Sequence, residues 1–76
     1  MNVTQKDFDF MVEILTRDII ALLMERKGLD MGTAFDTFYN SDTYQTLLRP
    51  ASGLYFQSAG YVYSFLDTEL KTGKMG

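Results

Sequence analysis

The chain has 76 residues, a hydrophobic fraction of 46%, a charged fraction of 22% and a formal net charge of −3. These values are typical of a folded globular domain with one small core, and they differ from those of a disordered chain. Cysteine and histidine are both absent, which excludes disulfides, thiolate chemistry and imidazole ligands, so we expect no enzyme activity, no bound metal and no cofactor.

The first predicted element is a long helix over residues 5–27. Thr4 can cap its start and Gly28 can close its end in the left-handed conformation. Apolar residues recur at spacings of three and four along one side, and a second apolar set widens that stripe. The first set is Phe8, Met11, Val12, Leu15, Ile19, Leu22 and Leu23, and the second is Phe10, Ile14, Ala21 and Met24. This stripe is wider than one small core requires, so we expect part of it to meet another chain.

Two short helices follow, over residues 31–39 and 42–49. Asp30 can cap the first, and Ser41 can cap the second. Pro50 disfavours helical geometry at Arg49 and so ends the second helix. Both helices are only two to three turns long.

The stretch from Ser52 to Leu70 has two interpretations. As a hairpin, residues 54–57 and 61–66 pair as strands, since aromatic and β-branched residues favour strands. That arrangement puts apolar side chains on both faces of a two-stranded ribbon that has too little chain to cover them. We therefore favour a helix over residues 59–72, preceded by an extended aromatic segment, residues 54–57, that docks on the core.

The predicted fold is all-α: a single domain over residues 1–76, built as a small bundle of one long and three shorter helices with a tail at residues 73–76. No apolar run approaches the 18 or so residues that a membrane span needs. Acidic residues stand near the N-terminus, where a signal peptide has basic ones. We therefore expect a cytoplasmic protein that does not enter a membrane.

Three acidic residues near the N-terminus, Asp7, Asp9 and Glu13, could in principle hold a hard cation, because Asp9 and Glu13 are four residues apart on one helical face. Calcium and magnesium sites draw more oxygen ligands from a shaped loop. We interpret these acids as a solvated first turn with a Glu13–Arg17 ion pair.

The main functional hypothesis is a small protein–protein interaction module that forms a homodimer and presents an apolar, tyrosine-rich surface to a protein partner. The residues expected at that surface are Leu54, Tyr55, Phe56 and Tyr63. The alternative is a small-ligand or single-stranded nucleic-acid binder that stacks its ligand on exposed tyrosines. The seven basic residues are scattered rather than clustered, which disfavours nucleic acid as a partner.

Residues 39–70 carry a recognisable order of motifs: Tyr-Asn-Ser, a Thr-Tyr pair, a leucine, a proline, Ser-Gly-Leu-Tyr, Gln-Ser, Tyr-Val-Tyr and an acidic-Leu end. In this order the segment resembles the second half of a family of short bacterial proteins of uncharacterised activity. Such proteins are often encoded beside larger genes suspected to be toxins, including ones that resemble ADP-ribosyltransferases. The resemblance implies an antitoxin-like or accessory role in which the chain binds a protein.

Overall fold

The described part of the chain, residues 4–74 of a computed structural model, is helical and contains no strand. Its α-helices are α1 (Gln5–Lys27), α2 (Met31–Tyr39), α3 (Asp42–Leu47) and α4 (Ala59–Thr72), and two short 3-10 helices, η1 (Pro50–Ser52) and η2 (Leu54–Phe56), lie between α3 and α4. The all-α prediction is therefore confirmed. Parts of the predicted domain and tail, residues 1–3 and 75–76, lie outside the described residues.

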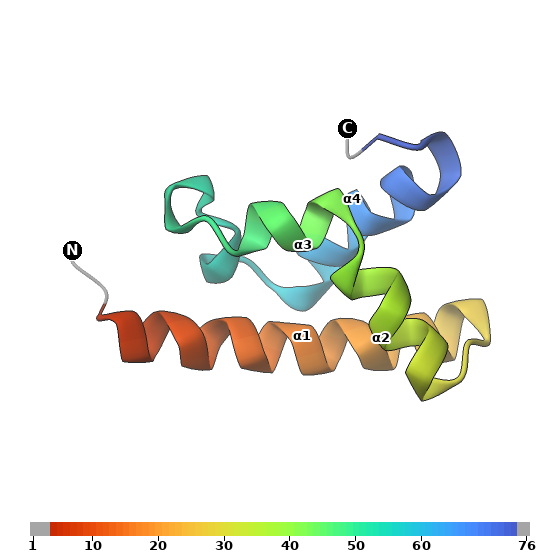
Figure 1. Ribbon diagram of the computed structural model, residues 1–76, viewed down its shortest axis with the longest axis horizontal. Helices are drawn as coiled ribbons and strands as arrows, with labels where there is room; N and C mark the ends of the chain where they lie inside the picture. Colours follow the sequence, from red (N-terminus) through yellow and green to blue (C-terminus); the bar gives the residue numbers. More distant parts are fainter. Residues whose placement is uncertain (1–3, 75–76) are drawn as a thin grey trace.

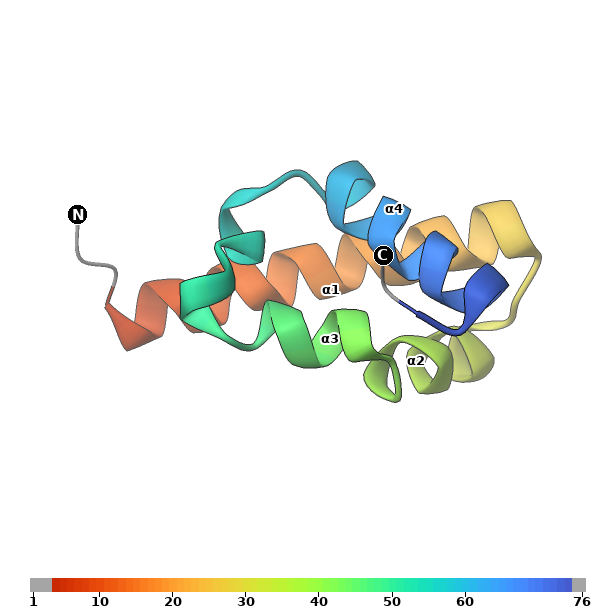
Figure 2. The same ribbon diagram turned by 90° about the horizontal axis from the view of Figure 1, so that it is seen from above.

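The helices form two layers. Figure 1 shows α1 running along one side of the molecule, with α2, α3 and α4 all packed on its other side. Seen from above in Figure 2, α3 and α2 lie along one flank of α1, and α4 crosses over α1. One broad side of α1 consequently faces away from every other helix.

Side-chain caps define where each α-helix begins. The hydroxyl of Thr4 accepts a hydrogen bond from the Asp7 N–H at 3.1 Å, and a carboxylate oxygen of Asp30 accepts from the Thr33 N–H at 2.7 Å. Serines play the same role for α3 and α4, through Ser41 and Ser58. Each cap satisfies a backbone donor that has no partner inside its helix. The start of each helix is thus fixed by residues that are local in the sequence.

The core runs along the inner side of α1 and is closed by residues of α2, α3, η2 and α4. It consists of Phe8, Val12, Leu15, Ile19, Ile20, Leu23, Ala34, Phe38, Leu47, Leu54, Tyr55, Val62, Tyr63 and Leu66. The second apolar set of α1 is placed differently. Phe10 is 62% exposed and Ile14 is 36% exposed, while Ala21 is exposed and Met24 half-buried.

The aromatic segment before α4 differs from the expectation. Residues 54–56 form a 3-10 turn instead of an extended segment, and backbone geometry becomes extended only at Gln57. Gly53 makes the turn possible, because its φ of +73° lies in the left-handed region that disfavours other residues. No strand pairs residues 54–57 with residues 61–66, so the hairpin interpretation is excluded for this part of the chain. Helix α3 ends at Leu47, two residues before the predicted end at 49.

A carboxylate on α4 fastens α3 to the bundle. Oε2 of Glu69 accepts a hydrogen bond from the Asp42 N–H at 2.7 Å, and Oε1 accepts from the Thr43 N–H at 2.9 Å and the Thr43 hydroxyl at 2.7 Å. Burial raises the pKa of Glu69, but these hydrogen bonds outweigh that effect and hold the pKa below its ordinary value. Glu69 therefore acts as a long-range cap for α3.

The C-terminal end of α1 is tied to α4 by charge. Lys27 Nζ lies 2.6 Å from Oδ1 of Asp67, and Lys71 Nζ lies 2.9 Å from the other oxygen of the same carboxylate. The Arg26 guanidinium lies over the Tyr63 ring, 5.4 Å from its centroid. These contacts join the end of α1 to α4 at the surface of the bundle.

Candidate functional site

A groove lies between α1 and the pair formed by α2 and α3. Its volume is about 510 Å³. Helix α1 supplies the floor and one rim, and α2 and α3 supply the opposite wall. The lining residues are Phe8, Asp9, Val12, Glu13, Thr16 and Arg17 on one side and Phe35, Tyr39, Tyr44 and Leu48 on the other. The groove is a concave surface that could receive a ligand or partner.

Stacked rings form the wall of the groove. The rings of Phe35 and Tyr39 are stacked with centroids 5.3 Å apart, and Tyr44 meets Tyr39 edge to face at 5.0 Å. Tyr44 also packs edge to face on the buried Phe38, again at 5.0 Å. Aromatic pairs at these distances stabilise one another beyond the area they bury. The wall is therefore preorganised by rings that are anchored in the core.

The edge of the wall remains open to solvent. Tyr39 is 41% exposed and Leu48 is 38% exposed, and both line the groove. Phe35 and Tyr44 are half-buried. An apolar ligand seated here would cover surface that the chain itself leaves uncovered, which favours binding through the hydrophobic effect.

The α1 rim carries most of the charge. Asp9, Glu13 and Arg17 follow at intervals of four residues, so they lie in a row along the helix. The Glu13–Arg17 ion pair expected from this spacing does not form within residues 4–74, where the ion pairs are those of Asp67. Asp9 accepts a hydrogen bond from the Gln5 amide at 2.8 Å but has no cationic partner in that range. The rim is therefore predominantly acidic.

A single hydroxyl group lies in the floor of the groove. Thr16 is 92% buried, since 8% of its surface is exposed, and it lines the groove. No hydrogen bond forms to its side chain within the described part of the chain. Among the described residues no fully buried polar side-chain atom lacks a partner, so the Thr16 hydroxyl oxygen is accessible from the groove. Thr16 thus offers a polar contact at the bottom of an otherwise apolar floor.

The four residues expected at a partner surface are not gathered at one surface. Leu54, Tyr55 and Tyr63 are buried in the core, with 7%, 8% and 4% of their surface exposed, and only Phe56 is exposed, at 55%. Tyr55 is covered because it packs edge to face on Phe8 at 5.0 Å. Tyr63 is covered because α4 contacts both α1 and α3, which buries a wider arc of the helix than one contact would. We therefore assign these three residues to the core and not to the predicted partner surface.

The sequence did not single out the groove. Its wall combines residues of α2 and α3 that are separate in the chain, and its rim lies on α1. Tyr39 and Tyr44 gave a partial signal, because two tyrosines stand near the junction of the two predicted short helices, Tyr39 at the end of the first and Tyr44 on the apolar face of the second. In residues 4–74 no three acidic side chains are placed to hold a metal ion, so Asp7, Asp9 and Glu13 do not form a metal site there.

Comparisons with known proteins place no constraint on the site. The chain matches no family model, and searches against curated proteins and against solved structures also found no match. Within the described residues, none of the helices combines the length and the apolar character required to cross a bilayer. The functional argument consequently rests on the groove itself.

Proposed function

We propose that this chain is a small protein-interaction module that binds an amphipathic helix of a protein partner in the groove between α1 and α2–α3. The observation that carries the proposal is the open aromatic wall, in which Tyr39 and Leu48 expose apolar surface beside the partly buried Phe35 and Tyr44. Grooves of this kind receive the apolar face of a helix, whose anchors repeat at intervals of three and four residues.

The charge of the rim selects the polar face of the partner. Asp9 and Glu13 supply two negative charges and Arg17 one positive charge, and neither acid has a cationic partner within the described residues. Lysine or arginine next to the apolar anchors complements this rim and steers the approach of the partner. The same acidic rim repels phosphates, which disfavours a nucleic-acid strand stacked on Tyr39.

The likeness of residues 39–70 to bacterial proteins encoded beside toxin-like genes identifies the first partner to test. We propose the product of an adjacent toxin-like gene, where one is present, with this chain in an antitoxin-like or accessory role. Binding to that product by purified proteins, measured by calorimetry, is the direct assay. The groove contributes the apolar wall, and the partner contributes the helix.

Matched leucine variants test whether the groove makes the contact. Leu48→Glu puts a charge on the groove wall, whereas Leu70→Glu puts the same charge on a leucine of similar exposure, 44%, on α4. We expect Leu48→Glu to weaken binding at least tenfold and Leu70→Glu to leave it unchanged, because a buried unpaired charge costs more than about 1.4 kcal/mol. Equal weakening by both variants, or by neither, contradicts the proposal.

A small apolar ligand is the second candidate, because a volume of about 510 Å³ lies within the usual range for small-molecule sites. A photo-crosslinking amino acid at position 39, with position 61 as the control, separates the two candidates. A crosslink from position 39 to a protein supports the proposed function. Recovery of a small molecule at position 39, with no protein adduct, supports the second candidate instead.

A further inference from the structure

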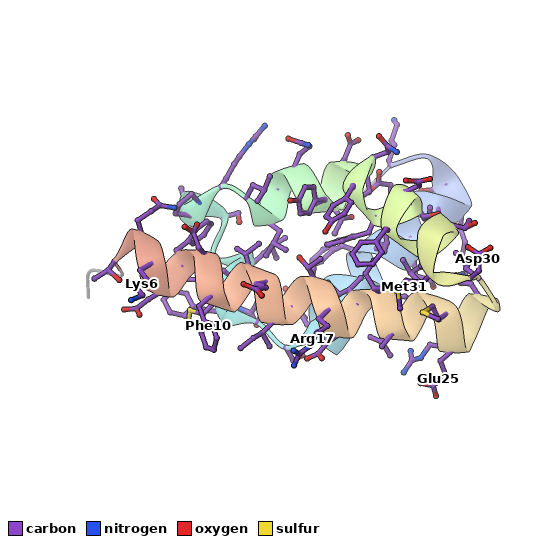
Figure 3. The ribbon with its side chains drawn as sticks, turned by 60° about the horizontal axis from the view of Figure 1, so that its bottom comes forward. Lys6, Phe10, Arg17, Glu25, Asp30 and Met31 are labelled. Atoms are coloured by element: carbon purple, nitrogen blue, oxygen red, sulfur yellow. The ribbon has the colours of Figure 1, made fainter. Side chains whose placement is uncertain are left out.

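The outer face of α1 carries Phe10, Ile14, Arg17, Ala21 and Met24, of which Met24 is half-buried against the core and Arg17 also lies on the rim of the groove. Figure 3 shows Phe10, Arg17 and Glu25 along the edge of α1 that faces away from α2 and α3. Phe10 is 62% exposed and Ile14 is 36% exposed. The five residues follow at spacings of four, three, four and three, the repeat by which one helix packs along another.

We propose that a second copy of this chain packs its own α1 antiparallel on this face, about a twofold axis near the middle of the helix. In this register Phe10 lies opposite Ala21 of the second copy, so a large side chain meets a small one. Ile14 lies opposite Arg17 of the second copy. Because the axis is twofold, each of these contacts occurs twice. This inference goes beyond the proposed function and does not depend on it.

Charge complementarity selects both the second copy and the antiparallel direction. When two antiparallel helices are related by a twofold axis, the same side of each helix faces its counterpart on the other. Glu13 and Arg17 lie on one side of the face, so Glu13 of each copy comes beside Arg17 of the other. In the described residues neither Glu13 nor Arg17 forms an ion pair within its own chain. A parallel pair would instead set Arg17 against Arg17. The face is therefore self-complementary in one direction only.

The size of the contact limits its strength. Helix α1 has 23 residues, so a strip about 35 Å long and about 10 Å wide presents roughly 350 Å² of projected contact per copy. A standard interface buries about 800 Å² per partner. Because the contact is smaller than a standard interface, we expect a reversible dimer with a dissociation constant in the micromolar range or weaker.

Sedimentation of the full chain over a concentration series, up to about 0.5 mM, measures this dimer. Phe10→Ala removes the largest apolar group of the face, and Phe56→Ala removes a phenylalanine of similar exposure, 55%, outside it. We expect Phe10→Ala to weaken the dimer about tenfold or more and Phe56→Ala to leave it unchanged. A monomer at the highest concentration, or equal effects of the two substitutions, overturns the proposal.

Charge reversal tests the register. Glu13→Arg and Arg17→Glu each place like charges together twice across the interface, so each alone is expected to weaken the dimer about tenfold at low salt. Mixing the two variants pairs a chain that has arginine at positions 13 and 17 with a chain that has glutamate at both positions. We expect this mixture to form a heterodimer as strong as the original dimer, and its failure to associate overturns the antiparallel register. Glu13 and Arg17 also line the groove, so the two proposals are separated by variants at other positions. Leu48→Glu is expected to leave the dimer unchanged, and Phe10→Ala is expected to leave the groove unchanged.

Discussion

Glu69 offers the most direct test of how this small bundle holds its shape. Its carboxylate accepts three hydrogen bonds from the start of α3, and α3 in turn carries Tyr44, part of the groove wall. Glu69→Gln keeps one carbonyl oxygen for the two Thr43 donors but turns an amide N–H₂ toward the Asp42 N–H. One charge-assisted bond is therefore lost and two become neutral.

The expected cost follows from this count. A hydrogen bond to a charged group contributes about 1.5–3 kcal/mol, and partial exposure of Glu69 reduces that value, so we expect Glu69→Gln to lower the free energy of unfolding by about 1 kcal/mol. Glu69→Ala removes all three bonds and should cost about 2–3 kcal/mol. For a domain of this size 1 kcal/mol corresponds to a shift of about 4–8 °C in Tm.

The loss of stability caused by Glu69→Gln should depend on pH in a defined direction. The pKa of Glu69 lies below its ordinary value of 4.5, so the carboxylate is more stable in the folded chain than in the unfolded one. Its contribution is complete above the ordinary pKa and is lost as the pH falls through the folded pKa. The difference in stability between the original chain and Glu69→Gln should therefore be constant near pH 7 and shrink in acid.

Thermal unfolding followed by circular dichroism, from pH 7 to pH 3, measures both effects. Glu25→Gln is a matched control, because Glu25 is exposed and forms no ion pair within residues 4–74. We expect the control to change Tm by less than about 2 °C at every pH. A Glu69→Gln chain that melts like the control at pH 7 would show that the carboxylate does not cap α3 in solution.

Three further changes test other parts of the fold. Gly53→Ala should lower stability by about 1 kcal/mol because φ is +73° there. Gly32→Ala should raise stability by up to about 1 kcal/mol, because Gly32 is helical and an added Cβ would only make ordinary contact with Asp30 Oδ1 at 3.8 Å. Chemical denaturation of the two variants compares the signs of these effects. Leu66→Ala empties a fully buried position on α4 and should cost about 2–5 kcal/mol, enough to unfold much of the population at 37 °C, as circular dichroism would show. The hydrogen bond from Lys27, followed by that from Lys71, lowers the pKa of Asp67. Asp67→Asn should therefore lower stability near neutral pH and at low salt, and its difference from the original chain should shrink in acid and at high salt. An unchanged Tm at low salt and pH 7 would argue against this ion pair.

Much of the secondary structure follows from residues that are close in the sequence. The hydroxyl of Thr4, the carboxylate of Asp30 and the hydroxyl of Ser41 each accept a hydrogen bond from a backbone N–H three residues later, in line with their prediction as caps. Ser58 does the same at the start of α4. The spacing of apolar residues at three and four marks helices because that spacing returns to one face of a 3.6-residue turn. The same periodicity predicted a helix, and not a strand, over residues 59–72.

Which apolar residues are buried depends on how many neighbours each helix has, and this is a tertiary property. Tyr63 was predicted to lie on the surface, but α4 contacts both α1 and α3, and Tyr63 is buried. Phe10 belongs to the same widened apolar stripe as Phe8, yet it is exposed, because no helix within residues 4–74 covers the outer side of α1. Periodicity identifies an apolar face but does not state how wide an arc of it is covered.

The groove was decided by tertiary structure alone. Its wall exists because Glu69, 26 residues further along the chain than Thr43, accepts hydrogen bonds from the start of α3 and holds that helix beside α2. Composition by itself established a small domain without cysteine or histidine, and local patterns established its helices. Concave sites form where elements that are distant in the chain meet, and no local sequence pattern specifies how far apart those elements lie in space.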